Sequence, residues 1–168
     1  MKLLILGAGT HGRVVQETAE STGAYEQTDF LDDRAPDAIG ILADYKHFRD
    51  TYGHAIAALG KNDLRSEWLS KLEQAGYSLA TLIHPTAYVS PSATLETGVV
   101  VLPLAAIHTK AVIHKGAIIG IGSLVDHDAT VGEYSHINTG TIVTAGCTVK
   151  SFTKLEAGAV CSDNPLNL

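Results

Sequence analysis

The chain has 168 residues, a formal net charge of −6 and a sequence pI of about 5.7. An acidic chain without a Lys/Arg cluster offers no surface for a phosphate backbone, so we expect no nucleic-acid partner. Residues 1–8 are too short for a signal-peptide core or a membrane span, which favours a cytoplasmic protein with no membrane partner. The length allows one large domain or two small ones.

The first residues have the pattern of a nucleotide-binding unit. An apolar run at residues 2–6 predicts a buried strand, and Gly-Ala-Gly-Thr-His-Gly follows directly at 7–12. Glycines at this spacing close a tight turn and let phosphate approach backbone N–H groups at a helix N-terminus. A helix is predicted next, and its apolar face consists of Val14, Val15, Thr18 and Ala19.

Two further strands and a second helix are predicted before the middle of the chain. The strands lie at residues 28–31 and 54–59, and a last strand at 77–83 leads into the second half. Asp32 and Asp33 end the second strand about 20 residues after the glycines, where this motif places a ribose-binding carboxylate. The second helix runs from about residue 62 to 75, can be capped by Asn62 or Asp63, and has an apolar face of Leu64, Trp68, Leu69 and Leu72.

The glycine motif allows three interpretations. Binding of NAD would need two mononucleotide halves, and only about 80 residues precede the second half of the chain, so one nucleotide fits better. An NAD-dependent oxidoreductase would rest on Gly7–Gly12 alone. The alternative is that the glycines only shape a turn and that the two aspartates are solvated loop residues. His11 inside the loop favours ligand binding because it adds a donor beside the expected phosphate.

The second half repeats with a strict period of six residues. An α-helix has a period of about 3.6 and a strand a period of about 2, so neither keeps this register. A parallel β-helix does, because each short strand forms one side of a coil and the coils stack in register. We therefore predict two domains, residues 1–82 and 83–168. The aliphatic positions, each expected to point inward and each preceded by a small corner residue from Ala87 onward, are Ile83, Val89, Leu95, Val101, Ile107, Ile113, Ile119, Val125, Val131, Ile137, Val143, Val149, Leu155 and Cys161.

The cysteines and most histidines have structural interpretations. Cys147 and Cys161 fall on inward positions, which favours buried reduced thiols over a disulfide. His108 and His114 each follow an inward residue and are expected to face solvent or to line an interface groove. The histidines of the repeats spread over several coils, so no metal site is predicted. His127 differs because it stands between two acids.

Five segments carry a resemblance to a known family. They are GAGTHGRVV at 7–15, FLDD at 30–33, ALGKNDLR at 58–65, LIHPTAYVSPSA at 82–93 and VDHDATVGEYSHINTG at 125–140. The chain resembles the NeuD/PglD-type acetyltransferases, a family of sialic-acid O-acetyltransferases and nucleotide-amino-sugar N-acetyltransferases. The implied fold is a small Rossmann-like half-domain followed by a left-handed parallel β-helix of hexapeptide repeats.

The resemblance implies acetyl transfer from acetyl-CoA to an amino or hydroxyl group of a nucleotide-linked sugar. It implies a homotrimer with active sites between subunits. His127 matches the general base and Asp128 the acid that orients it, although Asp126 is also adjacent. His136 and Gly158 match positions that contact acetyl-CoA. The positions that match nucleotide-sugar contacts are Gly9, Thr10, His11, Asp32, Asp33 and Gly60.

Two departures from the family pattern leave alternatives open. Ser151 and Phe152 replace an acidic or small residue followed by glycine. The sequence also ends soon after Cys161, where relatives usually carry a further coil and a tail. The acetyl-CoA site is then shallower, completed by a neighbouring subunit, or lost. The alternative functions are O-acetylation of a sialic acid or polysaccharide and a non-catalytic nucleotide-sugar-binding trimer.

Overall fold

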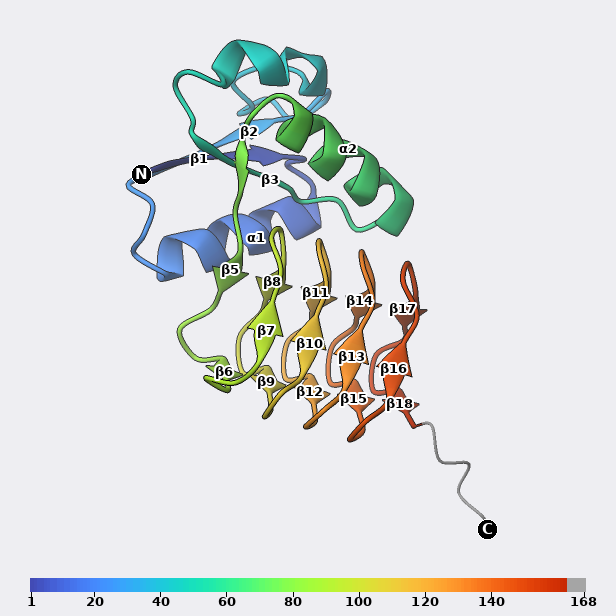
Figure 1. Ribbon diagram of the computed structural model, residues 1–168. Coiled ribbons are helices and arrows are strands. Elements are labelled where there is room, and N and C mark those ends of the chain that lie inside the picture. The colour runs from blue at the N-terminus through green and yellow to red at the C-terminus, as the bar shows by residue number, and fades with distance from the viewer. Residues whose placement is uncertain (163–168) are drawn as a thin grey trace.

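The N-terminal unit is a layered α/β structure (Figure 1), and the computed structural model describes residues 1–162 of the chain. Its four strands pair in parallel in the order β2-β1-β3-β4. The strands are β1 (Lys2–Leu6), β2 (Gln27–Leu31), β3 (His54–Ala57) and β4 (Ser78–Leu79), and the helices are α1 (Thr10–Ser21), the 3-10 helix η1 (Leu42–Phe48) and α2 (Asn62–Gln74).

Both faces of this sheet are covered. Leu3 and Ile5 pack with α1 on one face, whereas Leu4 and Leu6 pack with α2 on the other. Successive residues of a strand point to opposite faces, so a strand that is buried on both sides needs an unbroken apolar run. The prediction from residues 2–6 is therefore confirmed, strand and burial together.

Three details of the predicted elements differ from the structure. The N-cap of α2 is Lys61, without a side-chain cap, so the proposed caps Asn62 and Asp63 are wrong. Leu64, placed on the apolar face, is 38 % exposed, and the buried position beside it belongs to Arg65. The predicted strand at 77–83 is two short strands in different sheets, because the chain leaves the first sheet after Leu79.

The second half is a parallel β-helix whose sheets form the three sides of a prism. Within the described residues, two sides contain five strands and the third contains four. Paired strands are one coil apart, as Val125 and Val143 are. The first side holds β5 (Leu82–Ile83), β8 (Val100–Val101), β11 (Ile118–Ile119), β14 (His136–Ile137) and β17 (Lys154–Leu155). The second side holds β6 (Tyr88–Val89), β9 (Ala106–Ile107), β12 (Leu124–Val125), β15 (Ile142–Val143) and β18 (Val160–Cys161). The third side holds β7 (Thr94–Leu95), β10 (Val112–Ile113), β13 (Thr130–Val131) and β16 (Thr148–Val149).

The hexapeptide register produces the predicted prism core. The inward aliphatic residues from Val101 to Val149 are almost completely buried, and they form one cluster with the small corner residues. The inward residues near the two ends are less buried: Ile83 is 37 % exposed, since no coil precedes the one in which it lies, and Val89, Leu95, Leu155 and Cys161 are only partly buried. Three corner hydroxyls are buried, and each donates to a backbone carbonyl: Ser123 to Asn138, Ser135 to Lys150 and Thr141 to Glu156.

The turns of the prism use left-handed backbone conformations. Many of these positions are glycines, such as Gly116 with φ 65°, but five are not: Leu104, Lys110, Asp128, Tyr134 and Phe152. Phe152 has φ 60°, so the unusual Ser151-Phe152 pair still makes the turn for which the family pattern has glycine. Its ring packs against Tyr134 with the ring centroids 5.2 Å apart.

The two units meet along the first side of the prism. The first three residues of its outward column, Leu82, Val100 and Ile118, are buried, and the first two of them join the core beneath α1. The proposed division between residues 82 and 83 stays a prediction and falls within β5, both residues of which pair with β8 of the prism; residues 163–168 of the predicted second domain lie outside the described part. Within residues 1–162, no helix is long and apolar enough to cross a membrane.

Arg65 crosses the junction between the units. It is 2 % exposed, and its guanidinium donates to the carbonyls of Leu59 in the first unit and of Gly116 and Tyr134 in the second. Asn62 accepts a further bond from Arg65 and donates to the Phe152 carbonyl. Burial lowers the Arg65 pKa to about 10, so the group remains a cation at neutral pH.

Replacing Arg65 should destabilise the whole chain. Arg65→Met leaves several buried carbonyls without donors, and we expect a loss of about 3 kcal/mol in the free energy of unfolding. Arg49→Met is a matched control, because Arg49 also donates from Nε to a glycine carbonyl, that of Gly76, but at an exposed site. Urea unfolding at one fixed protein concentration measures both variants. Equal losses of unfolding free energy in the two variants would contradict the role of Arg65 in joining the two units.

Candidate active site

The glycine loop after β1 is built around two tightly constrained glycines. Gly7 has φ 99°, a conformation that favours glycine. A Cβ on Gly12 would lie 2.1 Å from the Gly7 carbonyl oxygen, so only glycine lets α1 pack this closely on the loop. Gly9 differs, because a Cβ there would meet nothing within 4 Å. Gly9 is also the N-cap of α1, and no side chain caps that end. The helix N-terminus beside it is suited to an anion.

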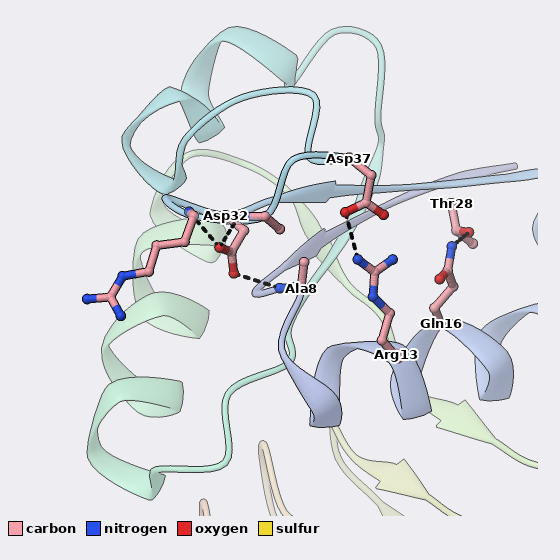
Figure 2. A network of polar contacts seen from close by, with 8 residues as sticks. Ala8, Arg13, Gln16, Thr28, Asp32 and Asp37 are labelled. Atoms are coloured by element: carbon pink, nitrogen blue, oxygen red, sulfur yellow. Dashed lines mark hydrogen bonds and ion pairs between the residues drawn. The ribbon is translucent and has the colours of Figure 1, made fainter.

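The two predicted ribose carboxylates accept hydrogen bonds from backbone amides in this structure, and Figure 2 shows those of Asp32. Asp32 accepts from the Ala8 amide at 2.8 Å with one oxygen and from the Arg34 and Ala35 amides with the other. These bonds, first that from Ala8, lower the Asp32 pKa. Asp33 accepts from the Leu42 amide at 3.0 Å. The motif did not indicate this role, in which Asp32 fixes the glycine loop; ribose binding by either acid stays a prediction.

A salt bridge that the sequence did not predict lies beside this loop (Figure 2). The Arg13 guanidinium of α1 lies 2.7 Å from the Asp37 carboxylate. Its central carbon also lies 4.4 Å from the centroid of the Phe30 ring. The contact connects α1 to the segment after β2, although both charged groups remain substantially exposed. No sequence pattern pairs these residues.

His11 and His136 meet at the junction of the two units. Their ring centroids are 6.3 Å apart, and His136 stands on β14 in the column next to buried Ile118. Burial, the neighbouring His136 ring and the Arg65 cation lower the His11 pKa to about 4. Burial, Arg65 and Lys154 lower the His136 pKa to about 4 as well. The Nδ1 atom of His136 is buried without a hydrogen-bond partner among the described residues. Both imidazoles are therefore neutral at physiological pH.

His127 and Asp128 form an acid–imidazole pair at another corner of the prism. They lie in the turn between β12 and β13, and Asp128 Oδ2 is 2.8 Å from His127 Nδ1. The left-handed conformation of Asp128, φ 57°, supplies the bend that brings neighbouring side chains together. Asp126 does not take this place; its carboxylate accepts the His127 backbone N–H at 2.7 Å. The hydrogen bond between His127 Nδ1 and the Asp128 carboxylate raises the His127 pKa.

Of the remaining predicted site residues, Thr10 is the first residue of α1, and Gly60 and Gly158 lie between elements of secondary structure. Gly60 follows β3 next to Leu59, and no atom would obstruct a Cβ there. Gly158 has φ 71° and donates its amide to the Thr139 carbonyl. Among residues 1–162, no group of three or more His, Cys, Asp or Glu side chains could hold a metal ion. The described residues also show no hydrogen bond or ring contact between His127 and the His11–His136 pair.

Comparisons with known proteins identify the family. Residues 2–72 match the PglD N-terminal domain. The acetyltransferase domain of PglB from Neisseria gonorrhoeae is 31% identical, with a TM-score of 0.76, over 96% of this chain and 91% of that chain. The chain belongs to the NeuD/PglD-type acetyltransferase family. PerB from Caulobacter crescentus, solved with CoA and GDP-perosamine, is 27% identical with a TM-score of 0.79, over 96% of this chain and 89% of that one.

These relatives confirm the predicted fold class and class of enzyme. The protein is an acetyltransferase with a small Rossmann-like half-domain followed by a left-handed parallel β-helix of hexapeptide repeats. A histidine-to-alanine mutant of the Caulobacter crescentus GDP-perosamine N-acetyltransferase, also solved with CoA and GDP-perosamine, is 29% identical with a TM-score of 0.77, over 96% of this chain and 89% of that chain.

The glycine loop makes a paired test possible. Gly9→Val should leave the fold intact, because the added side chain enters open space and the φ of −69° suits any residue. It should nevertheless weaken binding of nucleoside diphosphates, since valine occupies the approach to the helix N-terminus. Gly12→Ala should lower the melting temperature, because its Cβ would collide with the Gly7 carbonyl oxygen. Calorimetric binding and thermal melting separate the two effects; unchanged binding by Gly9→Val would move the ligand elsewhere.

Proposed function

We propose that this enzyme transfers acetyl from acetyl-CoA to the amino group of a nucleotide-linked sugar, with His127 as general base and Asp128 as its orienting acid. The hydrogen bond between His127 and Asp128 is the observation that carries the proposal. The carboxylate selects the tautomer with a proton on Nδ1, which leaves Nε2 to accept one. The N-acetyltransferases among the relatives favour an amine acceptor over a hydroxyl.

The proposed chemistry needs only one proton transfer at the start. The acceptor nitrogen attacks the thioester carbonyl carbon and passes a proton to Nε2 of His127. The tetrahedral intermediate then collapses, the carbon–sulfur bond breaks, and the protonated imidazole returns the proton to the leaving thiolate. Acetyl-CoA is already an activated ester, so a positioned base of suitable pKa is sufficient.

The nucleotide-sugar is assigned to the N-terminal unit, with Gly9, Thr10, His11, Asp32, Asp33 and Gly60 as proposed contacts. The open space at Gly9 and the helix N-terminus beside it support this assignment. The single four-stranded sheet is suited to one nucleotide rather than to a dinucleotide. PerB, solved with GDP-perosamine, supports a nucleotide-linked amino-sugar as the ligand class.

Acetyl-CoA is assigned to the prism, with His136 and Gly158 as proposed contacts. His136 lies beside His11, so the two ligands would meet at the junction between the units. In one chain His127 stands at a different corner of the prism, on the turn after β12. A neighbouring subunit then has to supply the base, which supports active sites between subunits of a homotrimer.

An exposed apolar column supports the trimer. The outward positions of the second side of the prism are in register one coil apart. Three of them are large and exposed by 45 % or more, and Ile142 is exposed by 37 %. Contiguous apolar surface of this kind marks an interface between proteins. The column consists of Tyr88, Ala106, Leu124, Ile142 and Val160.

Substitution of His127 tests the base. His127→Ala should lower kcat by about 10²–10⁴-fold, the usual contribution of a positioned base. His114→Ala is the matched control, because His114 pairs with Glu96 at 2.9 Å elsewhere on the prism. The assay is acetyl-CoA-dependent thiol release with nucleotide-linked amino-sugars and with sialic acids. Full activity of His127→Ala would refute the mechanism; turnover with sialic acids alone would favour O-acetylation, and none with either a nucleotide-sugar sensor.

The pH profile tests Asp128. The base works only when neutral, so kcat should rise with pH through the His127 pKa, which Asp128 holds above 6.5. Asp128→Ala removes the hydrogen bond that raises this pKa, and the midpoint should shift toward lower pH while kcat falls less than in His127→Ala. The measurement is kcat from pH 5 to 9, about the range in which histidine titrates. An unchanged midpoint would assign the orienting role to another group.

The trimer is tested by charging the column. Ile142→Glu places a carboxylate in the proposed apolar contact and should yield monomers in analytical ultracentrifugation. Thr94→Glu is the control, because Thr94 is an exposed outward residue on the third side of the prism. A trimer that survives Ile142→Glu and is lost in Thr94→Glu would place the interface on the other side.

A further inference from the structure

A second acid–imidazole pair lies one coil before His127. His108 follows β9 and Asp126 follows β12, two strands that pair in register. The Nδ1 atom of His108 lies 3.3 Å from Asp126 Oδ1. The same oxygen accepts the backbone N–H of His127 at 2.7 Å. Asp126 therefore hydrogen-bonds the backbone of His127 and lies at ion-pair distance from the His108 ring.

The two imidazoles face a common space. Their ring centroids are 6.1 Å apart and their planes are inclined by 63°. Each Nδ1 faces a carboxylate, so Nε2 is the ring nitrogen that each histidine offers to a ligand. Lys110 lies near Asp128 and contributes to lowering the pKa of that carboxyl, which the hydrogen bond with His127 lowers most. The space is thus bordered by two imidazoles, two carboxylates and one ammonium group.

A cavity of about 320 Å³ extends from this pair across the second side of the prism. Apolar side chains form most of its wall, and His108 and Asp126 are its two polar lining residues. Ala106, Leu124 and Ile142 of this wall belong to the column proposed as the trimer contact, so a neighbouring subunit would complete the pocket beside His108 and Asp126. His108 is about half exposed, with 54 % of its side chain accessible, so a ligand can reach it.

The order of the coils separates the acceptor from acetyl-CoA. The proposed acetyl-CoA contacts, His136 and Gly158, both follow His127 along the chain and lie in the same or later coils. His108 lies one coil earlier, on the opposite side of His127 along the prism axis. The acceptor amine has to approach the thioester from the side that acetyl-CoA leaves open. That side is the one on which His108 stands.

We propose that His108, held by Asp126, binds a hydroxyl group of the acceptor sugar next to the amine that His127 deprotonates. The proposal rests on the proposed role of His127, because it places the acceptor relative to that base. The hydrogen bond from His108 Nε2 orients the sugar and does not take part in the proton transfer. His108 is thereby a determinant of which amino-sugars are acetylated.

The test separates the two substrates kinetically. His108→Ala should raise the KM for the nucleotide-linked amino-sugar about tenfold, the effect of one lost hydrogen bond, and leave the KM for acetyl-CoA unchanged. His108→Gln retains a hydrogen-bonding group at a similar distance from the backbone and should recover part of the loss. His114→Ala removes a carboxylate-paired histidine away from the proposed site and should change neither KM. Thermal melting of each variant excludes an effect through folding.

Two results would overturn the proposal. One is a higher KM for acetyl-CoA in His108→Ala with an unchanged acceptor KM, which would place His108 on the cofactor side. The other is no change in either KM while His127→Ala is inactive, which would leave the base in place and remove His108 from the site. Full activity of His127→Ala would refute the proposed mechanism instead, and the acceptor KM of His108→Ala would still decide whether His108 binds the sugar.

Discussion

The buried guanidinium of Arg65 determines how the two units are placed relative to each other. A buried cation is costly unless each donor is satisfied, and its acceptors belong to both units. The N-terminal unit alone supplies only Leu59 and Asn62. Separation of the units would therefore expose donors and carbonyls together. This constraint fixes the distance between His11 on one unit and His136 on the other.

The same cation influences the chemistry of the junction. Together with burial, it holds the pKa of His11 and of His136 at about 4, so both rings remain neutral hydrogen-bonding groups over the physiological range. His127 is in the opposite setting, because its ring is solvent-exposed and Asp128 raises its pKa. The enzyme thus separates histidines suited to ligand binding from the histidine suited to accepting a proton.

Local periodicity made most of the fold predictable from the sequence. The six-residue register gave the prism and its inward residues, and the glycine loop gave the strand–turn–helix at the start, because both patterns lie within a few neighbouring residues. Arg65 could not be found this way. Among the polar residues of α2, its type and position indicate a solvent-facing charge. Leu64 was wrongly placed on the buried face because the sequence does not show that the prism packs there.

The site was predictable in its residue types and less so in its contacts. The acid–histidine–acid run at 126–128 indicated a base and its partner, but the choice between Asp126 and Asp128 depended on the backbone of one turn. Asp32 was assigned to ribose because the motif places an acid there, whereas its bond to Ala8 depends on how the second strand lies beside the loop. No pattern along the chain joins His11 to His136.

The turn at His127 shows how stacking of the coils positions a reactive side chain. Three consecutive coils have a left-handed residue at this corner, namely Lys110, Asp128 and Gly146. Aspartate tolerates that conformation better than most residues, and there its carboxylate reaches the neighbouring imidazole. The His127 amide is held by Asp126 and its carbonyl by the Gly146 amide. Under the proposed role of His127 as the base, backbone fixed on both sides would keep its ring in one orientation without rearrangement when the acceptor arrives, which is the condition for efficient proton transfer.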